Sequence, residues 1–214
     1  MTRAGRITPA QERALETLWA KYGVAADGPI DLEALFGRQA SRVAELGFGN
    51  GDNLLALASA HPERDFLGIE VHRPGVGRLL LQLEERGIGN VRLICRDAVE
   101  VLQHSLLGPW LDEILILFPD PWPKKRHHKR RLIQPGFVAL LAERLKRGGT
   151  LRMATDWGPY AEQMLANLSA EPRLRNLAPD GGFVPRPQER QPTRFERRGE
   201  RLGHAVWDLA FTRV

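Results

Sequence analysis

The sequence predicts an α/β protein whose sheet is mostly parallel and is flanked by helices. Short apolar runs, each bounded by turn or charged residues, alternate with stretches that read as helices over most of the chain. Strands that alternate with helices are typical of a parallel sheet. The last segment, His204–Val214, alternates apolar and other residues, which predicts an antiparallel strand at the edge of that sheet.

Length and composition indicate one globular domain. A chain of 214 residues with 43% hydrophobic content suits a single core. We expect this domain to span residues 41–214, after an N-terminal helical extension over residues 1–40. The single cysteine, Cys95, cannot form an internal disulfide, and the first residues lack the apolar run of a signal peptide. We therefore expect a cytoplasmic protein, and both a monomer and a homodimer are compatible with the sequence.

The first expected element is a helix from Thr8 to Tyr22. Thr8 suits the N-cap, Pro9 suits the first helical position, and Gln11 completes a capping box. The apolar residues of the segment gather on one face, which packs on the core or lies beside it: Leu15, Leu18, Trp19 and Tyr22.

Five strand-and-helix units follow this helix. The first strand begins at Arg42 and ends in glycines, and the others are expected at residues 65–71, 91–98, 113–122 and 150–157. The expected helices open at Leu54, run up to Arg86, cover Pro135–Lys146 and begin near Pro159. Residues 179–201 are rich in Pro, Arg and Gly, which predicts a loop.

A glycine-rich turn follows the first strand. Gly47 and Gly49 let the backbone approach a ligand without interference from Cβ, at the carboxyl end of a strand, where open α/β sheets bind ligands. A dinucleotide site requires a third glycine where this chain has Asp52, whose charge would oppose a pyrophosphate. S-adenosylmethionine carries no phosphate, so the turn is compatible with that cofactor.

Acidic residues stand at the ends of three successive strands. Glu70 follows Gly51 by 19 positions, a spacing that suits hydrogen bonds to the ribose hydroxyls. Asp97 is placed to accept from the amino group of an adenine, and Glu45 to face the cationic methionine part. Any one of these acids alone is equally well explained as a cap at a strand end. Their presence at three successive strand ends favours a nucleoside site.

A proline-rich loop, residues 118–123, follows the fourth strand. Its prolines hold the neighbouring side chains on stiff backbone. A planar base stacked on Trp122 would offer the guanine donors N1–H and the exocyclic amine to Asp120. The guanine N7 has no proton to lose, so its methylation depends mainly on alignment, which supplies roughly 7 to 11 kcal/mol of a barrier. We therefore expect Asp120 to orient and stabilise the base rather than to act as an obligatory base.

The net charge of +5 is concentrated directly after this loop. Residues 123–131 contain six Lys or Arg, two His and no acid. A basic run is usually a solvated face, but next to Asp120 it suits contacts with RNA phosphates. The RNA contacts expected in this run are Arg126, His127, His128, Lys129, Arg130 and Arg131.

Three further features complete the candidate site. Asp156 is a fourth acid at the end of a strand, and residues 191–198 form an Arg-rich stretch that either clamps substrate or remains a solvated loop. The histidines have no zinc-like spacing with Cys95. We therefore expect no metal.

The motifs ELGFGNGD, FLGIEVH, RDAVEVL, FPDPWPKKRHHKRR, MATDW and TRFERRG, in this order, resemble those of the bacterial tRNA (guanine-N7)-methyltransferases. The resemblance covers almost the whole chain, and PDPWPKKRHHKRR is its most specific element. It implies a seven-stranded class I methyltransferase fold (Rossmann-like), S-adenosylmethionine as cofactor, and methylation of a guanine in the variable loop of tRNA.

The same resemblance implies a role for individual residues. It makes Asp120 the expected catalytic residue. It places the cofactor against Glu45, Gly47, Gly49, Glu70, Asp97 and Asp120. It places the substrate against Lys124, Asp156, Thr193, Arg194, Phe195 and Glu196.

Two other functions remain open from the sequence. The Pro-Asp-Pro-Trp loop is similar in layout to that of enzymes that methylate the exocyclic amines of adenine or cytosine. A non-catalytic RNA-binding module would also use the basic run, although it would not need the acids at 45, 70, 97 and 120 together. A small-molecule methyltransferase would gain nothing from six clustered cations.

Overall fold

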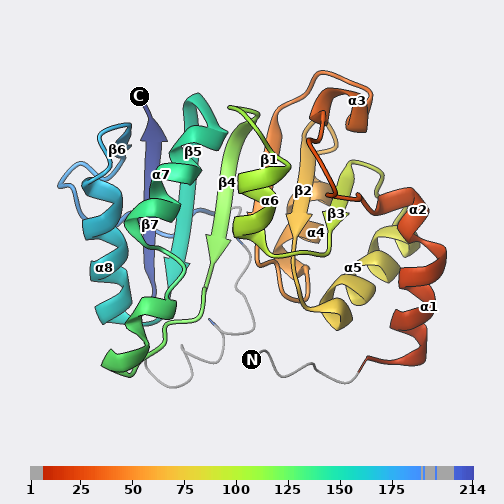
Figure 1. Cartoon of the computed structure of the whole chain (residues 1–214), viewed down its shortest axis with the longest axis horizontal. Coiled ribbons are helices and arrows are strands. Elements are labelled where there is room, and N and C mark those ends of the chain that lie inside the picture. Colours follow the sequence, from red (N-terminus) through yellow and green to blue (C-terminus); the bar gives the residue numbers. More distant parts are fainter. Residues whose placement is uncertain (1–6, 189, 191–195, 197–204) are drawn as a thin grey trace. The chain divides into compact units, whose positions relative to one another are not determined.

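The computed structural model describes residues 7–188, Arg190, Glu196 and residues 205–214 (Figure 1). The chain divides into two compact units, one ending at Leu107 and the other beginning at Gly108. Each unit combines parallel strands with helices, so the predicted α/β class is confirmed. In the parts that the structure describes, no helix is both long and apolar enough to cross a membrane.

The first unit contains three parallel strands in the order β3-β2-β1: β1 (Arg42–Leu46), β2 (Asp65–Ile69) and β3 (Val91–Ile94). Every residue of β1 and β2 is buried. Burial at successive positions means that both faces of these strands are covered. Apolar residues therefore occur side by side in each strand, as in Val43-Ala44 and Phe66-Leu67. Because the strands are parallel, their carboxyl ends share one edge of the sheet.

The described residues of the first unit form six helices, which are labelled in Figure 1. They are α1 (Pro9–Thr17), α2 (Trp19–Tyr22), α3 (Leu32–Phe36), α4 (Asp52–Ala60), α5 (Arg73–Glu85) and α6 (Ala98–His104). The predicted capping box is present, since Thr8 N donates to Gln11 Oε1 at 2.8 Å and Gln11 N to Thr8 Oγ1 at 3.3 Å. The predicted single helix is interrupted at Leu18, between α1 and α2.

The N-terminal helix α1 packs on α5. A Cβ at Gly77 of α5 would lie 2.7 Å from the Gln11 carbonyl oxygen, so only glycine permits this approach. Tyr22 is fully buried, and its hydroxyl donates to Glu84 Oε2 at 2.9 Å. The helical segment formed by α1 and α2 therefore packs within the first unit. The boundary at residue 40 stays a prediction.

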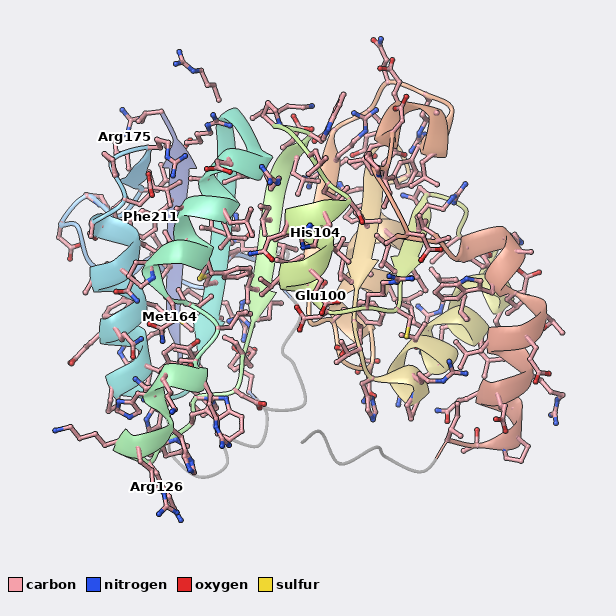
Figure 2. All side chains as sticks on the ribbon, in the orientation of Figure 1. Glu100, His104, Arg126, Met164, Arg175 and Phe211 are labelled. Atoms are coloured by element: carbon pink, nitrogen blue, oxygen red, sulfur yellow. The ribbon has the colours of Figure 1, made fainter. Side chains whose placement is uncertain are left out.

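The described residues of the second unit form four strands in the order β4-β5-β7-β6: β4 (Leu111–Leu117), β5 (Leu145–Thr155), β6 (Leu174–Asn176) and β7 (Trp207–Arg213). β4 and β5 are parallel, whereas β7 is antiparallel to both β5 and β6. Its helices are the 3₁₀ helix η1 (Lys125–Arg130), α7 (Pro135–Arg144) and α8 (Gly158–Ser169). The core of this unit includes Tyr160, Met164 and Phe211, of which the last two are labelled in Figure 2.

The sequence placed the C-terminal strand correctly in direction but not in position. β7 is antiparallel, as predicted, yet it lies between β5 and β6, so β6 is the outer strand. The three residues of β6 are too few to show a hydrophobic period. The predicted strand at 91–98 ends at Ile94, because Asp97 already caps the next helix.

Candidate active site

The turn after β1 has a backbone that favours glycine. Gly47, Gly49 and Gly51 have φ values of 74°, 59° and 78°, a left-handed conformation that is costly for other residues. A Cβ at Gly51 would lie 2.7 Å from a methyl carbon of Leu79, whereas a Cβ at Gly47 or Gly49 would meet nothing within 4 Å. Gly51 therefore serves helix packing, and Gly47 and Gly49 border open space into which a ligand can fit.

Glu70, which follows β2, holds this turn in place. Its Oε2 accepts from Gly49 N at 2.7 Å, and its Oε1 accepts from Val71 N at 2.7 Å and from His72 N at 2.9 Å. A carboxylate offers about four lone-pair sites, so these backbone donors leave roughly one. The predicted contact with both ribose hydroxyls stays a prediction, and the structure adds a contact with the turn that the sequence did not indicate.

Glu45 is a buried acid near the end of β1. It is 3% exposed, and Asn53 Nδ2 donates to its Oε2 at 2.9 Å. Burial raises the pKa of Glu45 to about 7, while the hydrogen bond from Asn53 lowers this pKa and the charge of Glu70 raises it. The other amide atom, Asn53 Oδ1, is buried without a hydrogen-bond partner among the described residues. A buried carboxylate beside an unpaired acceptor fits an ammonium group, such as that of the methionine part of the cofactor.

Asp97 caps α6 with one oxygen. Its Oδ1 accepts from Val99 N at 2.8 Å and from Glu100 N at 3.2 Å, as an N-cap does. Within the described residues Oδ2 accepts no hydrogen bond, and the residue is exposed. The capping explanation is thus correct for one oxygen, and the predicted contact with an adenine amine stays a prediction for the other.

The proline-rich loop after β4 has strained backbone at both ends. Phe118 and Trp122 have φ values of 53° and 42°, and such conformations cost of order 1 to 3 kcal/mol each for non-glycine residues. Asp120 is exposed between them. Conformations of this kind persist where surrounding contacts hold them and occur often at functional sites. This local strain therefore supports a functional loop.

Asp120 and Asp156 follow neighbouring parallel strands of the second unit. Leu117 of β4 pairs with Ala154 of β5, and Phe118 N donates to the Ala154 carbonyl at 2.8 Å. The two acids come three and two residues beyond that pair, so they lie at the same edge of this sheet. Asp156 is half-buried at the start of the turn to α8.

Trp122 is covered on one face by a cation. The guanidinium carbon of Arg130 lies 5.0 Å from the centre of a Trp122 ring, and His127 meets the tryptophan edge-on with ring centres 5.7 Å apart. A base stacked on Trp122 must therefore use the opposite face or displace Arg130.

The basic run forms η1 and the residues on either side of it. Arg126 projects from η1 into solvent (Figure 2). Five of the six cations are exposed, and none of these five forms an ion pair within the described part of the chain: Lys124, Lys125, Arg126, Lys129 and Arg130. His127 and His128 are half-buried. Exposed cations without acidic neighbours suit a polyanion.

Arg131 departs from the rest of the run. It is 3% exposed, its Nε donates to the Pro121 carbonyl at 2.8 Å, and its Nη1 donates to Gln163 Oε1 at 2.5 Å. In this structure the guanidinium is enclosed rather than exposed to a phosphate. The contact of Arg131 with RNA stays a prediction.

Glu196 is also turned inward. It is 1% exposed, and its oxygens accept from Arg190 Nη1 at 2.7 Å and Nη2 at 2.9 Å. Arg190 also donates to Asp208 of β7, and its guanidinium lies 5.6 Å from the centre of the Phe118 ring. In this position the carboxylate of Glu196 binds Arg190 rather than facing solvent. The contact of Glu196 with substrate stays a prediction. The other predicted substrate contacts here, Thr193, Arg194 and Phe195, lie outside the described residues.

The sequence did not single out Asn53, Arg190 or Asp208. Each is a polar side chain that the fold buries beside another polar group, and the sequence contains no spacing that would pair them. Among the described residues no group of three His, Cys, Asp or Glu is arranged to hold a metal ion. The absence of a metal stays a prediction.

Solved structures of low sequence identity share this fold. A variant of the 16S rRNA (adenine(1408)-N(1))-methyltransferase from Catenulisporales acidiphilia matches with a TM-score of 0.58 and 16% identity, over 89% of this chain and 96% of that chain. The 16S rRNA methyltransferase KamB matches with a TM-score of 0.58 and 14% identity, over 99% of this chain and 96% of that chain. The fold that these structures share with this chain is that of class I methyltransferases.

Sequence comparison narrows the class to one family. A family model described as "Putative methyltransferase" matches residues 39–209. The tRNA (guanine-N(7)-)-methyltransferase of Pseudomonas paraeruginosa is 57% identical over 99% of this chain and 87% of its own length. The enzyme of that name from Leifsonia xyli is 58% identical over 97% of this chain and 92% of its own. The chain belongs to the bacterial tRNA (guanine-N7)-methyltransferase family.

Proposed function

We propose that this enzyme transfers a methyl group from S-adenosylmethionine to N7 of a guanine in tRNA, in the variable loop, and that it does so in the cytoplasm. The observation that carries the choice of RNA is the run of five exposed cations directly after the Asp120 loop. The sequence identity to relatives named tRNA (guanine-N(7)-)-methyltransferase supports the choice of guanine as the base and N7 as the atom.

When bound, the cofactor would supply a methyl group on a positively charged sulfur. Guanine N7 would accept this methyl group through its lone pair, with the neutral thioether as the leaving group and the positive charge left on the guanine. N7 carries no proton at neutral pH, so the protein does not have to remove one there. What remains for the protein is to bind, orient and exclude water.

The residues of the first unit would hold the cofactor. Glu45 and the unpaired Asn53 Oδ1 would accept from its ammonium group, and Asp97 Oδ2 from its adenine amine. Gly47 and Gly49 would leave room for the chain between these two groups. Glu70 would keep the turn in the required conformation through Gly49 N.

The residues of the second unit would hold the guanine and the RNA. Asp120 would accept from N1–H and the exocyclic amine, and Trp122 would stack on the base. A carboxylate in this place also stabilises the positive charge that the guanine gains. Lys124 and Asp156 would contact the nucleotide, and the exposed cations of η1 the phosphates.

The test is transfer of labelled methyl to unmodified tRNA, with the product identified by mass spectrometry of digested nucleosides. Wild type is expected to form 7-methylguanosine. Asp120→Ala is expected to lose this activity, whereas Glu162→Ala, an exposed acid on α8, serves as the matched control and keeps it. Label in a methylated exocyclic amine would support the amine-methylating alternative. Absence of any transfer, with RNA binding retained, would support the binding-module alternative.

A further inference from the structure

The backbone of residues 119–123 depends on side chains outside the loop for its hydrogen bonds. Three of these five residues are prolines and have no N–H to donate. Within the described part of the chain only two backbone groups of residues 119–123 make hydrogen bonds: the Pro121 carbonyl accepts from Arg131 Nε at 2.8 Å, and the Pro123 carbonyl lies 3.4 Å from His128 Nε2. The hydrogen bond from Arg131 is the shorter of the two, and the Pro121 carbonyl that accepts it belongs to the residue directly after Asp120.

Arg131 is itself held by α8. Its Nη1 donates to Gln163 Oε1 at 2.5 Å, and its guanidinium carbon lies 4.8 Å from the centre of the Tyr160 ring. Tyr160 is fully buried, and its hydroxyl accepts from Ile133 N at 3.2 Å. Arg131 therefore connects the loop to a rigid platform on the first turns of α8.

The position of Arg131 is unfavourable for stability alone. Its Nη2 is buried without a hydrogen-bond partner among the described residues, and burial lowers the pKa of the side chain. The described residues provide no carboxylate that pairs with this charge. A buried cation without an anion is costly, which favours a functional reason for its position.

We infer that Arg131 is a positioning residue for the Asp120 loop, which it holds through the Pro121 carbonyl while its guanidinium lies over the Tyr160 ring. The inference rests on the proposed methylation of guanine. Lysine cannot replace arginine here, because only a planar guanidinium can donate from two nitrogens in fixed directions and lie flat on a ring. The loop has positive φ at Phe118 and Trp122 and requires such a contact to keep that conformation.

The main test compares Arg131→Lys with Arg175→Lys. Arg175 is an exposed arginine of β6, labelled in Figure 2, and its variant is the matched control. For Arg131→Lys we expect kcat to fall by about 10²-fold, the effect of a misplacement near 1 Å, with little change in KM for tRNA or in thermal midpoint. An unchanged kcat would overturn the inference. A loss of kcat that is accompanied by a clear fall in the thermal midpoint would also overturn it, because the loss would then be explained by a purely structural role.

A second variant and a second readout cover the case in which Arg131→Lys folds poorly. Gln163→Ala leaves Arg131 in place but removes one of its acceptors, and we expect a smaller loss of kcat that does not add to that of Arg131→Lys. Hydrogen–deuterium exchange of the peptide with Asp120 and Trp122 should be faster in both variants. Wild-type levels of exchange would overturn the inference. An inactive wild type would overturn the proposed function instead, and exchange would still decide the role of Arg131.

Discussion

Asn53 Nδ2 donates to Glu45 Oε2 at 2.9 Å in a place where both side chains are almost fully enclosed, with exposures of 5% and 3%. Glu45 thus has one neutral donor, and burial raises its pKa from an ordinary 4.5 to about 7. This relationship makes the charge of Glu45 sensitive to pH near neutrality and leads to two predictions.

The first concerns stability. Between pH 4.5 and 7 the folded chain holds a proton on Glu45 that the unfolded chain has released. This proton contributes to the free energy of unfolding in full below the unfolded-state pKa of 4.5, and the contribution is lost as pH rises through the folded-state pKa of about 7. The free energy of unfolding should therefore fall with rising pH, by about 3 kcal/mol in total. Glu45→Gln should remove this part of the pH dependence and be more stable than wild type above about pH 8. Chemical denaturation at several pH values measures both, and parallel curves for the two proteins would contradict the prediction.

The second concerns cofactor binding. An ammonium group attracts the ionised form of Glu45, so S-adenosylmethionine should bind more tightly as pH rises through about 7 and should release a proton when it binds below that pH. Calorimetry in two buffers of different ionisation enthalpy measures the proton. In Glu45→Gln both the pH dependence and the proton release should disappear, and proton release that persists in this variant would assign it to another group.

The glycine turn provides a third prediction with an internal control. Gly49→Ala and Gly51→Ala both place a Cβ on left-handed backbone, at a cost of about 1 to 2 kcal/mol. Only Gly51→Ala also collides with Leu79, so it should be the less stable of the two on thermal unfolding. Gly49→Ala should fold and yet bind the cofactor at least tenfold more weakly, about 1.4 kcal/mol, because its methyl group occupies the open space. Unchanged cofactor affinity in Gly49→Ala would place the ligand elsewhere.

The buried ion network of the second unit provides a fourth. Arg190 Nε and Nη2 each donate to one oxygen of Asp208 at 3.0 Å. The carboxylate of Glu196 accepts from Nη1 and Nη2 of the same arginine. Asp208→Asn should leave part of the arginine charge without its partner and reduce the free energy of unfolding by about 3 kcal/mol, the usual cost of breaking a buried pair. Glu162→Gln, on an exposed acid, is the control and should change it by less than about 0.5 kcal/mol. A loss no larger than that of the control would show that the network contributes nothing to stability.

The features that the sequence predicted share a local signal. Thr8 and Gln11 are three residues apart, Gly47 and Gly49 directly follow an apolar run, and Asp120 has a proline on each side in the sequence, so each can be recognised within a few positions. The β strands predicted in this way all exist, although several boundaries moved by a few residues.

The features that the sequence missed depend on chain segments that are far apart. Asp208 accepts a hydrogen bond from Arg190, 18 positions away in the sequence, and Arg131 donates one to Gln163, 32 positions away. Arg131 shows the difficulty most clearly, since it shares its charge and sequence position with the exposed cations. Only the fold, through Tyr160 and α8, turns it inward.

The last prediction separates these two kinds of cation by salt. Arg126 is exposed on η1 and has no acidic partner within the described residues, whereas Arg131 is buried. The slope of log affinity for tRNA against log salt changes by about 0.7 to 0.9 for each phosphate that a cation no longer neutralises. Arg126→Gln should therefore flatten the slope by roughly that amount, and Arg131→Lys and the control Arg175→Gln should leave it unchanged. Filter binding of tRNA at several salt concentrations measures the slope. A slope that is the same for Arg126→Gln and wild type would mean that this residue does not contact the RNA.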